Sequence, residues 1–340
     1  MGLGQSKNIS INDSNKFGTK LDTKPNTKFD NNKIERRKKF RSWSALSKGD
    51  GNLNEIWNFS SGGKRIHYSS LRISKISDYI IDEESKRLQR RHQLFKRIWQ
   101  NNFSAPVDET LTAGGARVLE IGCGPGMWTI EMARSYQSST FTGVDIIPLF
   151  PQEKKPENAK FLQANVLSGL PFLDDTFDFV YMGLLVTAFT ATEWEKVIPE
   201  IVRITKQGGW IEFMESDFQY YNEGPTTARL TDSWIIGPLD LYILKTMEAN
   251  ESIDKNIKTE ERSCFVGKWA GELDITKGWI TVKSPMSKLM RIKSREYDEI
   301  IVTFVKEVEQ HKTYFKNWRF FGQKIITTSA SNITTPSWYQ

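Results

Sequence analysis

Three glycines at alternate positions, Gly122, Gly124 and Gly126, have the spacing of a ligand-binding turn. They follow a short apolar run at 117–121 and precede a stretch with helical spacing at about 127–136. A glycine-rich turn between a strand and a helix lets a ligand approach the backbone, and the helix start offers free N–H donors. The motif alone is weak evidence, because such turns also occur without a ligand. Its spacing also differs from the Gly-x-Gly-x-x-Gly pattern of dinucleotide-binding proteins.

Two carboxylates near this turn restrict the kind of ligand. Glu120 lies just before the glycines, where it would repel a pyrophosphate and suit a ligand with an ammonium group. Asp145 ends the next predicted strand, 23 residues after Gly122, where a carboxylate can accept both hydroxyl groups of a ribose. The alternative for Asp145 is a structural role as a helix cap. The two carboxylates together suit a nucleoside that carries an amino acid and no phosphate, and S-adenosylmethionine is such a molecule.

The elements that position these residues alternate between strand and helix. Apolar runs predict five strands, at 117–121, 141–146, 160–164, 177–182 and 210–215. A capping box at residues 192–195 predicts the start of a helix, and Gly208-Gly209 predicts its end. Apolar strands separated by helices are typical of a parallel sheet covered on both faces. With two further strands below, we predict an α/β fold: a Rossmann-like, doubly wound, mostly parallel seven-stranded sheet with helices on both faces.

The chain on either side of this core is less regular. Before it, a helix face is predicted by the spacing of Ile81, Leu88, His92, Phe95 and Trp99. After it, we expect mostly helix with an irregular end over residues 225–275. The remaining elements are an amphipathic helix at about 297–308 and two strands, at 279–282 and 318–322.

Several segments together resemble the class I S-adenosylmethionine-dependent methyltransferases. The first is the run at 118–126, and others follow in the family's order at 143–146, 163–166, 170–172, 175–180 and 208–212. A finer resemblance is to the fungal branch that includes the LaeA-like regulators of secondary metabolism. Its residues are Arg87-Leu88-Gln89 with His92, Trp128, and Phe321-Gly322-Gln323-Lys324.

The resemblance implies a cofactor role for each matching residue. The methionine part of S-adenosylmethionine would contact the backbone of Gly122, Cys123, Gly124 and Gly126, with Glu120 near its ammonium group. Asp145 would hold the ribose, and Ile146 would pack on the adenine. The adenine edge would meet Asn165 and Val166, and Met182 would lie beneath the sulfonium. Many relatives have Asp where this chain has Asn165, whose amide oxygen can still accept a bond from the adenine amino group.

No catalytic residue is assigned, because methyl transfer mainly requires alignment of the nucleophile with the methyl group. A general base is needed only when the nucleophile arrives protonated. His92 lies on an apolar helix face and is predicted to be a packed core histidine. Glu215 and Asp217 follow the fifth strand and are predicted to be exposed loop carboxylates. Tyr79, just before the first helix, marks where a lid over the cofactor could begin.

Two functions fit these features. One is an enzyme that methylates an unidentified small molecule or protein. The other is a regulatory protein that binds S-adenosylmethionine and interacts with a partner, with little or no turnover. Methyltransferases that act on base amines or on cytosine carbon are disfavoured, since no Asp/Asn-Pro-Pro-Tyr or Pro-Cys motif is present. No cluster of His, Cys and Asp has metal-ligand spacing, so no metal is expected.

The charge of the chain is concentrated in its first residues. Residues 1–50 carry 12 Lys and Arg against 5 Asp and Glu, whereas the remaining 290 carry 35 against 36. The folded part therefore has no basic excess that would indicate nucleic-acid binding. We predict a disordered basic tail at 1–70, a methyltransferase domain at 71–326 and a frayed tail at 327–340. The domain divides into a cofactor-binding core at 71–215 and a helical insertion with the last strands at 216–326.

The location of the protein is predicted from its cysteines and its basic tail. Two cysteines give no disulfide framework, which favours a reducing, cytoplasmic compartment. The first six residues fit the N-myristoylation pattern at Gly2. Because one acyl chain binds membranes only marginally, the six basic residues within Lys33–Arg41 would supply a second, electrostatic contact. The same run could instead be a nuclear localisation signal.

Removing residues 1–65 is expected to leave the cofactor affinity and the melting temperature nearly unchanged, because a disordered segment contributes few buried contacts. Calorimetry and thermal melts of the shortened chain check this, and a large fall in melting temperature would show that the segment packs on the domain. The lipid hypothesis requires that Gly2→Ala lower the membrane-bound fraction in cells.

Overall fold

The computed structural model describes residues 78–186, 188–189, 191–217, 219–233, 239–267 and 283–327. Several predictions lie outside these residues. They concern the basic tail with Gly2 and Lys33–Arg41, the strand at 279–282, and the chain after Thr327.

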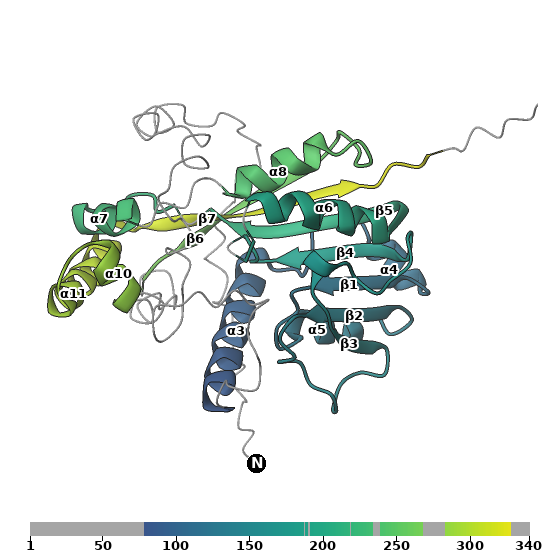
Figure 1. Ribbon diagram of the computed structural model, residues 1–340, viewed down its shortest axis with the longest axis horizontal. Helices are drawn as coiled ribbons and strands as arrows, with labels where there is room; N and C mark the ends of the chain where they lie inside the picture. The colour runs from purple at the N-terminus through teal and green to yellow at the C-terminus, as the bar shows by residue number, and fades with distance from the viewer. Residues whose placement is uncertain are drawn as a thin grey trace, which may run out of the picture. The chain divides into compact units, whose positions relative to one another are not determined.

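The described residues form a seven-stranded sheet in the order β3-β2-β1-β4-β5-β7-β6 (Figure 1). The first five strands are parallel, while β7 runs antiparallel to its neighbours β5 and β6. The predicted α/β class and mostly parallel seven-stranded sheet are therefore confirmed. The strands are β1 Arg117–Ile121, β2 Thr140–Asp145, β3 Ala159–Gln163, β4 Phe177–Gly183, β5 Thr205–Ser216, β6 Lys258–Phe265 and β7 Tyr314–Gln323.

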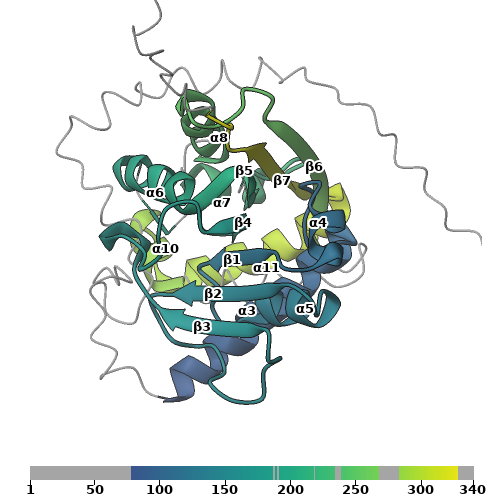
Figure 2. The same cartoon turned by 90° about the vertical axis from the view of Figure 1, so that its right-hand side faces the viewer.

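Helices cover both faces of the sheet, and Figure 2 shows α5 and α6 on opposite sides of the strands. One face packs against α3, α4 and α5, and the other against α6 and α8. Adjacent strand residues such as Val118 and Leu119 belong to different cores, as the two-residue period of a strand requires. A third core joins α7, α10 and α11. The helices are α3 Asp78–Trp99, α4 Asp108–Ala113, α5 Met127–Ser135, α6 Ala191–Ile204, α7 Pro225–Ser233, α8 Leu239–Ala249, α10 Lys283–Leu289 and α11 Ser294–His311, with a short η4 at Val166–Ser168.

Two predicted boundaries of the helix before β5 are wrong. Helix α6 begins at Ala191, so Thr192 lies in its first turn instead of at the cap. The helix ends at Ile204, and Gly208-Gly209 lies within β5. Here the Gly208 N–H donates to the Lys324 carbonyl at 2.8 Å, and the pairing of β4 with β5 shifts register between Phe177 and Phe179. The glycines thus accommodate a bulge that β7 helps to hold.

The prediction of mostly helix over residues 225–275 is confirmed at α7 and α8 and wrong at 258–265, which form β6. This strand pairs along its whole length with β7, which spans 314–323 and exceeds the predicted 318–322. Most of β6 is polar and partly exposed, so no hydrophobic alternation marks it in the sequence.

A buried ion pair joins the chain before β1 to the middle of the sheet. Glu212 on β5 and Arg319 on β7 are 0% and 2% exposed, and Arg319 Nε lies 3.4 Å from Glu212 Oε1. Burial raises the pKa of Glu212 to about 7, against the opposing effect of the Arg319 charge. Glu212 Oε2 accepts the backbone N–H groups of Ser104 at 2.8 Å and Ala105 at 2.7 Å. The loop after α3 is thereby fixed to β5.

Arg319 extends this connection to the end of α3. Its guanidinium donates to the side chain and the carbonyl of Asn101, at 2.6 and 3.1 Å. It also lies over the Trp99 ring, 4.3 Å from the ring centre, where a cation and an aromatic face attract. The Trp99 indole N–H in turn donates to Asn317 on β7. The last residue of α3 is thus held by β7, far away in sequence.

Arg319→Met should lower the free energy of unfolding by about 3–5 kcal/mol, because it leaves the Glu212 carboxylate buried without its cation. Urea denaturation measures the loss. The matched control is Arg229→Met, which breaks a pair with Glu296 whose side chains are 52% and 47% exposed. That substitution should cost less than about 1 kcal/mol. Equal losses in the two variants would contradict the anchoring role of Arg319.

Candidate functional site

The glycine loop connects β1 to α5 at the carboxyl edge of the sheet. The N–H groups of Gly122 and Cys123 both donate to the Val144 carbonyl, at 2.8 and 3.0 Å, and Gly126 N–H donates to Cys123 O at 2.8 Å. Gly122 has φ 72° and Gly126 φ 74°, values that L side chains rarely adopt. The loop is therefore a tight turn whose shape β2 helps to hold.

Side chains from other elements also require glycine at these positions. A Cβ on Gly122 would lie 2.3 Å from Cδ1 of Leu185, and one on Gly126 would lie 2.5 Å from the Phe161 ring. A Cβ on Gly124 would meet Leu88 of α3 at 3.3 Å. Three apolar side chains, from α3, β3 and the turn after β4, thus surround the loop. Sequence reasoning missed them, since no spacing links them to the glycines.

Glu120 lies on β1 beside the loop and is 8% exposed. Its Oε2 accepts the backbone N–H of Thr129 at 3.0 Å and also the Thr129 hydroxyl. Its Oε1 accepts no hydrogen bond from the residues that the structure describes. Burial, more than the nearby charge of Asp145, raises the pKa of Glu120 to about 8. An ammonium group beside it would favour the ionised form.

Cys123 lies inside the loop and is buried. Its Sγ is 3.8 Å from the Gly124 carbonyl. Burial raises the pKa of the thiol well above its ordinary range. The side chain is therefore an inert, packed thiol, and the predicted contact of this residue with a ligand is left to its backbone.

Asp145 ends β2 and joins it to the glycine loop. Oδ2 accepts the Gly124 N–H at 2.8 Å, and Oδ1 accepts the Ile147 N–H at 2.9 Å. Neither donor lies in a helix, so Asp145 does not act as a helix cap. Burial raises its pKa. Since each carboxylate oxygen has a second lone pair, both oxygens can accept a further bond from a ligand.

The residues predicted to meet the adenine lie at the ends of β2 and β3. Ile146 follows Asp145 and is partly buried. The Ala164 N–H donates to Asp145 O at 3.0 Å, which brings the chain before Asn165 to the same edge. Asn165 caps η4 by accepting the Leu167 N–H at 3.0 Å, and Val166 is buried in the core. The structure therefore gathers Asp145, Ile146 and Asn165, while Val166 faces inward.

Met182 and His92 are engaged in packing and in pairing within the fold. Met182 is 1% exposed and packs in the core beside its strand neighbours Ile121 and Phe213. His92 Nε2 lies 3.2 Å from Glu131 Oε2, so the pair joins α3 to α5. Burial lowers the pKa of His92, against the effect of the Glu131 carboxylate.

The predictions for Glu215 and Asp217 need correction. Glu215 lies within β5 and is fully buried, because the strand extends one residue beyond it. Asp217 is partly buried and accepts the N–H groups of Gln219 and Lys316, both at 3.1 Å, and the Tyr221 hydroxyl at 3.0 Å. It therefore stabilises a turn. Tyr79 lies in the first turn of α3.

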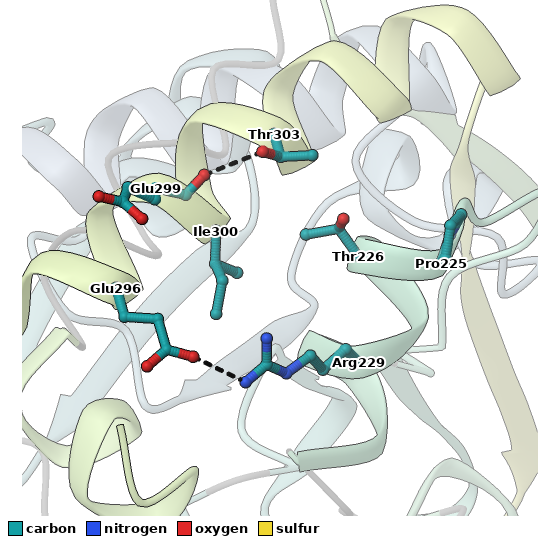
Figure 3. A pocket seen from close by; sticks show the side chains of 7 residues that line it. All are labelled: Pro225, Thr226, Arg229, Glu296, Glu299, Ile300 and Thr303. Carbon is teal, nitrogen blue, oxygen red and sulfur yellow. Dashed lines mark hydrogen bonds and ion pairs between the residues drawn. The ribbon is translucent and has the colours of Figure 1, made fainter. Parts of the chain in front are cut away.

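A separate pocket of about 400 Å³ lies between α7 and α11 (Figure 3). The Arg229–Glu296 ion pair at 3.1 Å borders it, and no residue of the glycine loop lines it. It is therefore not the site described above. The lining residues are Pro225, Thr226, Arg229, Glu296, Glu299, Ile300 and Thr303.

The described ranges contain neither a metal-binding cluster nor a membrane-spanning helix. No three His, Cys, Asp or Glu side chains there are grouped so that they could hold a metal ion. In the same ranges, no helix has the length and apolar character needed to cross a membrane.

The comparison with known families agrees with this geometry. The profile described as "Methyltransferase domain" matches residues 118–209, which begin in β1 and end in β5. The matched range contains the glycine loop, Asp145 and Asn165. Residues 118–209 belong to a class I S-adenosylmethionine-dependent methyltransferase domain. The sheet order and the antiparallel β7 describe the Rossmann-like fold of this domain.

Relatives of the methyltransferase domain are found among fungal proteins. The chain is 30% identical to Methyltransferase str3 of Strobilurus tenacellus, over 50% of this chain and 57% of that protein. It is 29% identical to N-methyltransferase sirN of Leptosphaeria maculans, over 41% and 50%. It is also 29% identical to Secondary metabolism regulator laeA of Coprinopsis cinerea, over 42% and 35%. The chain thus spans about half of these relatives' length, or less.

Asp145→Asn should weaken S-adenosylhomocysteine binding by roughly ten- to a hundredfold, because the ribose loses a charged acceptor. It should also lower the stability of the unliganded chain by about 1–3 kcal/mol, since one of the two backbone N–H groups meets an amide donor. Titration calorimetry and urea melts measure the two effects.

Asp217→Ala is the control away from the loop, because it removes a carboxylate whose Oδ1 accepts two backbone N–H groups. It should lose stability and keep its affinity. If both variants behave alike, Asp145 is structural only and the predicted cofactor position is wrong.

Proposed function

We propose that the chain is an S-adenosylmethionine-dependent methyltransferase acting on a small molecule or a protein. The observation that carries this proposal is the meeting of Glu120 and Asp145 at the glycine loop, on the carboxyl edge of the sheet. Ligands of open α/β folds bind at this edge. The relatives named as methyltransferases support the same activity.

The chemistry of the site fits this cofactor. Its polar side chains are two carboxyls and one amide, and none of the residues predicted to hold the cofactor is Lys or Arg. Such a set accepts hydrogen bonds from an ammonium group and ribose hydroxyls, and it disfavours phosphates. Glu120 would hold the ammonium group, Asp145 the ribose and Asn165 the adenine amino group. When bound, the cofactor supplies a methyl group on positively charged sulfur.

The contribution of the chain to the reaction is mainly positional. In-line displacement requires the acceptor nucleophile to face the methyl group, and such alignment can supply about 7–11 kcal/mol. His92 pairs with Glu131, and Asp217 holds a turn, so neither is assigned as a base. We leave the catalytic base unassigned, as a nucleophile that arrives unprotonated needs none.

A second candidate is a regulatory protein that binds S-adenosylmethionine with little or no turnover. The similarity to Secondary metabolism regulator laeA favours it, since its identity of 29% equals that of N-methyltransferase sirN. Both candidates need the same cofactor site, so turnover separates them. Labelled S-adenosylmethionine incubated with a cell extract would label an acceptor only in the first case.

The limits of the domain and its location are further parts of this proposal. The proposed domain covers residues 71–326. Its two predicted parts, 71–215 and 216–326, belong to one unit, and the contact of Glu212 with Arg319 supports this. We also keep a cytoplasmic location, with either membrane contact through Gly2 and Lys33–Arg41 or a nuclear signal in that basic run.

Calorimetry on the full chain should show micromolar binding of S-adenosylmethionine and S-adenosylhomocysteine, about −8 kcal/mol, because the site presents acceptors for the ammonium group and the ribose. NAD should not bind comparably, since its pyrophosphate would face two carboxyls. Tight NAD binding without a signal from S-adenosylhomocysteine would overturn the proposed function.

A further inference from the structure

The turn after β4 has an unfavourable backbone conformation beside the glycine loop. Leu184 has φ 58°, a left-handed value that is unfavourable for a branched side chain and persists only where neighbours enforce it. Two hydrogen bonds from β5 do so. Leu184 N–H donates to the Met214 carbonyl at 2.7 Å, and Leu185 N–H donates to Oε1 of Glu215 at 2.8 Å.

The turn places the Leu185 side chain against the first glycine of the loop. Leu185 is partly buried on the core shared with α6, and its Cδ1 lies 2.3 Å from the position that a Cβ on Gly122 would occupy. The contact is so close that any larger residue at 122 would displace it. Leu185 therefore forms one wall beside the backbone predicted to contact the methionine part of the cofactor.

Glu215 is an unusual residue for the end of a buried strand. Its side chain is fully buried, and taking a carboxylate out of water costs several kcal/mol. Its Oε1 nevertheless accepts the Leu185 N–H, and this bond ties the turn after β4 to β5.

We propose that Glu215 is a positioning residue of the cofactor site, which acts by holding the Leu184–Leu185 turn so that Leu185 packs on Gly122. This role rests on the proposed function, because it assigns the space beside Gly122 to the methionine part of S-adenosylmethionine. The proposal assigns Glu215 no contact with the cofactor. It connects β5 to the glycine loop of β1 through one backbone bond and one side-chain contact.

Four single variants and one double variant of the full chain test the proposal. Glu215→Leu removes the acceptor at similar volume, and Glu215→Gln keeps an acceptor oxygen. Leu185→Ala keeps the N–H bond and removes the wall, and Leu244→Ala is a control at a partly buried leucine of α8 in the same core. Titration with S-adenosylhomocysteine gives affinity, hydrogen exchange of a peptide covering residues 183–186 gives the order of the turn, and thermal melts give stability.

Glu215→Leu should weaken binding about tenfold and speed exchange at the turn, while Glu215→Gln should stay within about threefold of wild type. Leu185→Ala should weaken binding about as much without faster exchange of the 183–186 peptide. The double variant Glu215→Leu/Leu185→Ala should lose no more than the larger single loss, since both residues act through one contact. Leu244→Ala should melt earlier and bind normally.

The outcomes separate two failures. Normal binding and normal exchange in Glu215→Leu, with a wild-type chain that binds, would overturn the positioning role alone. A wild-type chain that binds no S-adenosylhomocysteine would overturn the proposed function and the positioning role together. A loss of affinity in Leu244→Ala equal to that in Glu215→Leu would show that stability alone explains the effect.

Discussion

The buried pair of Glu212 and Arg319 holds together parts of the domain that no local signal connects. Two charges taken out of water need both each other and hydrogen bonds. Glu212 Oε1 and Arg319 Nε face each other at 3.4 Å, and the other polar atoms of both side chains bond the loop after α3. That loop sets the end of α3, and Leu88 on the same helix lies over Gly124. One helix of the cofactor side is thus fixed by an arginine near the end of the described chain.

The glycine loop is shaped from three directions. Asp145 and the Val144 carbonyl hold its backbone from β2, Glu120 joins β1 to the start of α5, and Leu185 packs on it from the turn after β4. The shape of the loop is therefore set mainly by these contacts with neighbouring elements. Because the loop is already ordered, binding a ligand costs less conformational entropy. The carboxyls therefore serve the fold and the proposed ligand at once.

The sequence allowed the first four parallel strands to be predicted, since β1 to β4 lie between clear turns, and each of their ends differs from prediction by at most one residue. It did not reveal β6, whose residues are mostly polar and depend on β7 for their pairing. The sequence predicts a loop position for Glu215, because a carboxylate after an apolar run ordinarily marks a strand's end. Its burial follows from pairing with Trp318, a contact about a hundred residues away in sequence.

The placement of β7 between β5 and β6 bears on how the chain is synthesised. Domains fold as they leave the ribosome, from the amino terminus onward. While β7 is still inside the exit tunnel, β5 has an open edge and Glu212 lacks its guanidinium partner. Open strand edges are sites of aggregation. The nascent domain is therefore exposed until the residues up to Gln323 emerge, which makes it a natural client for chaperones that shield unpaired strands.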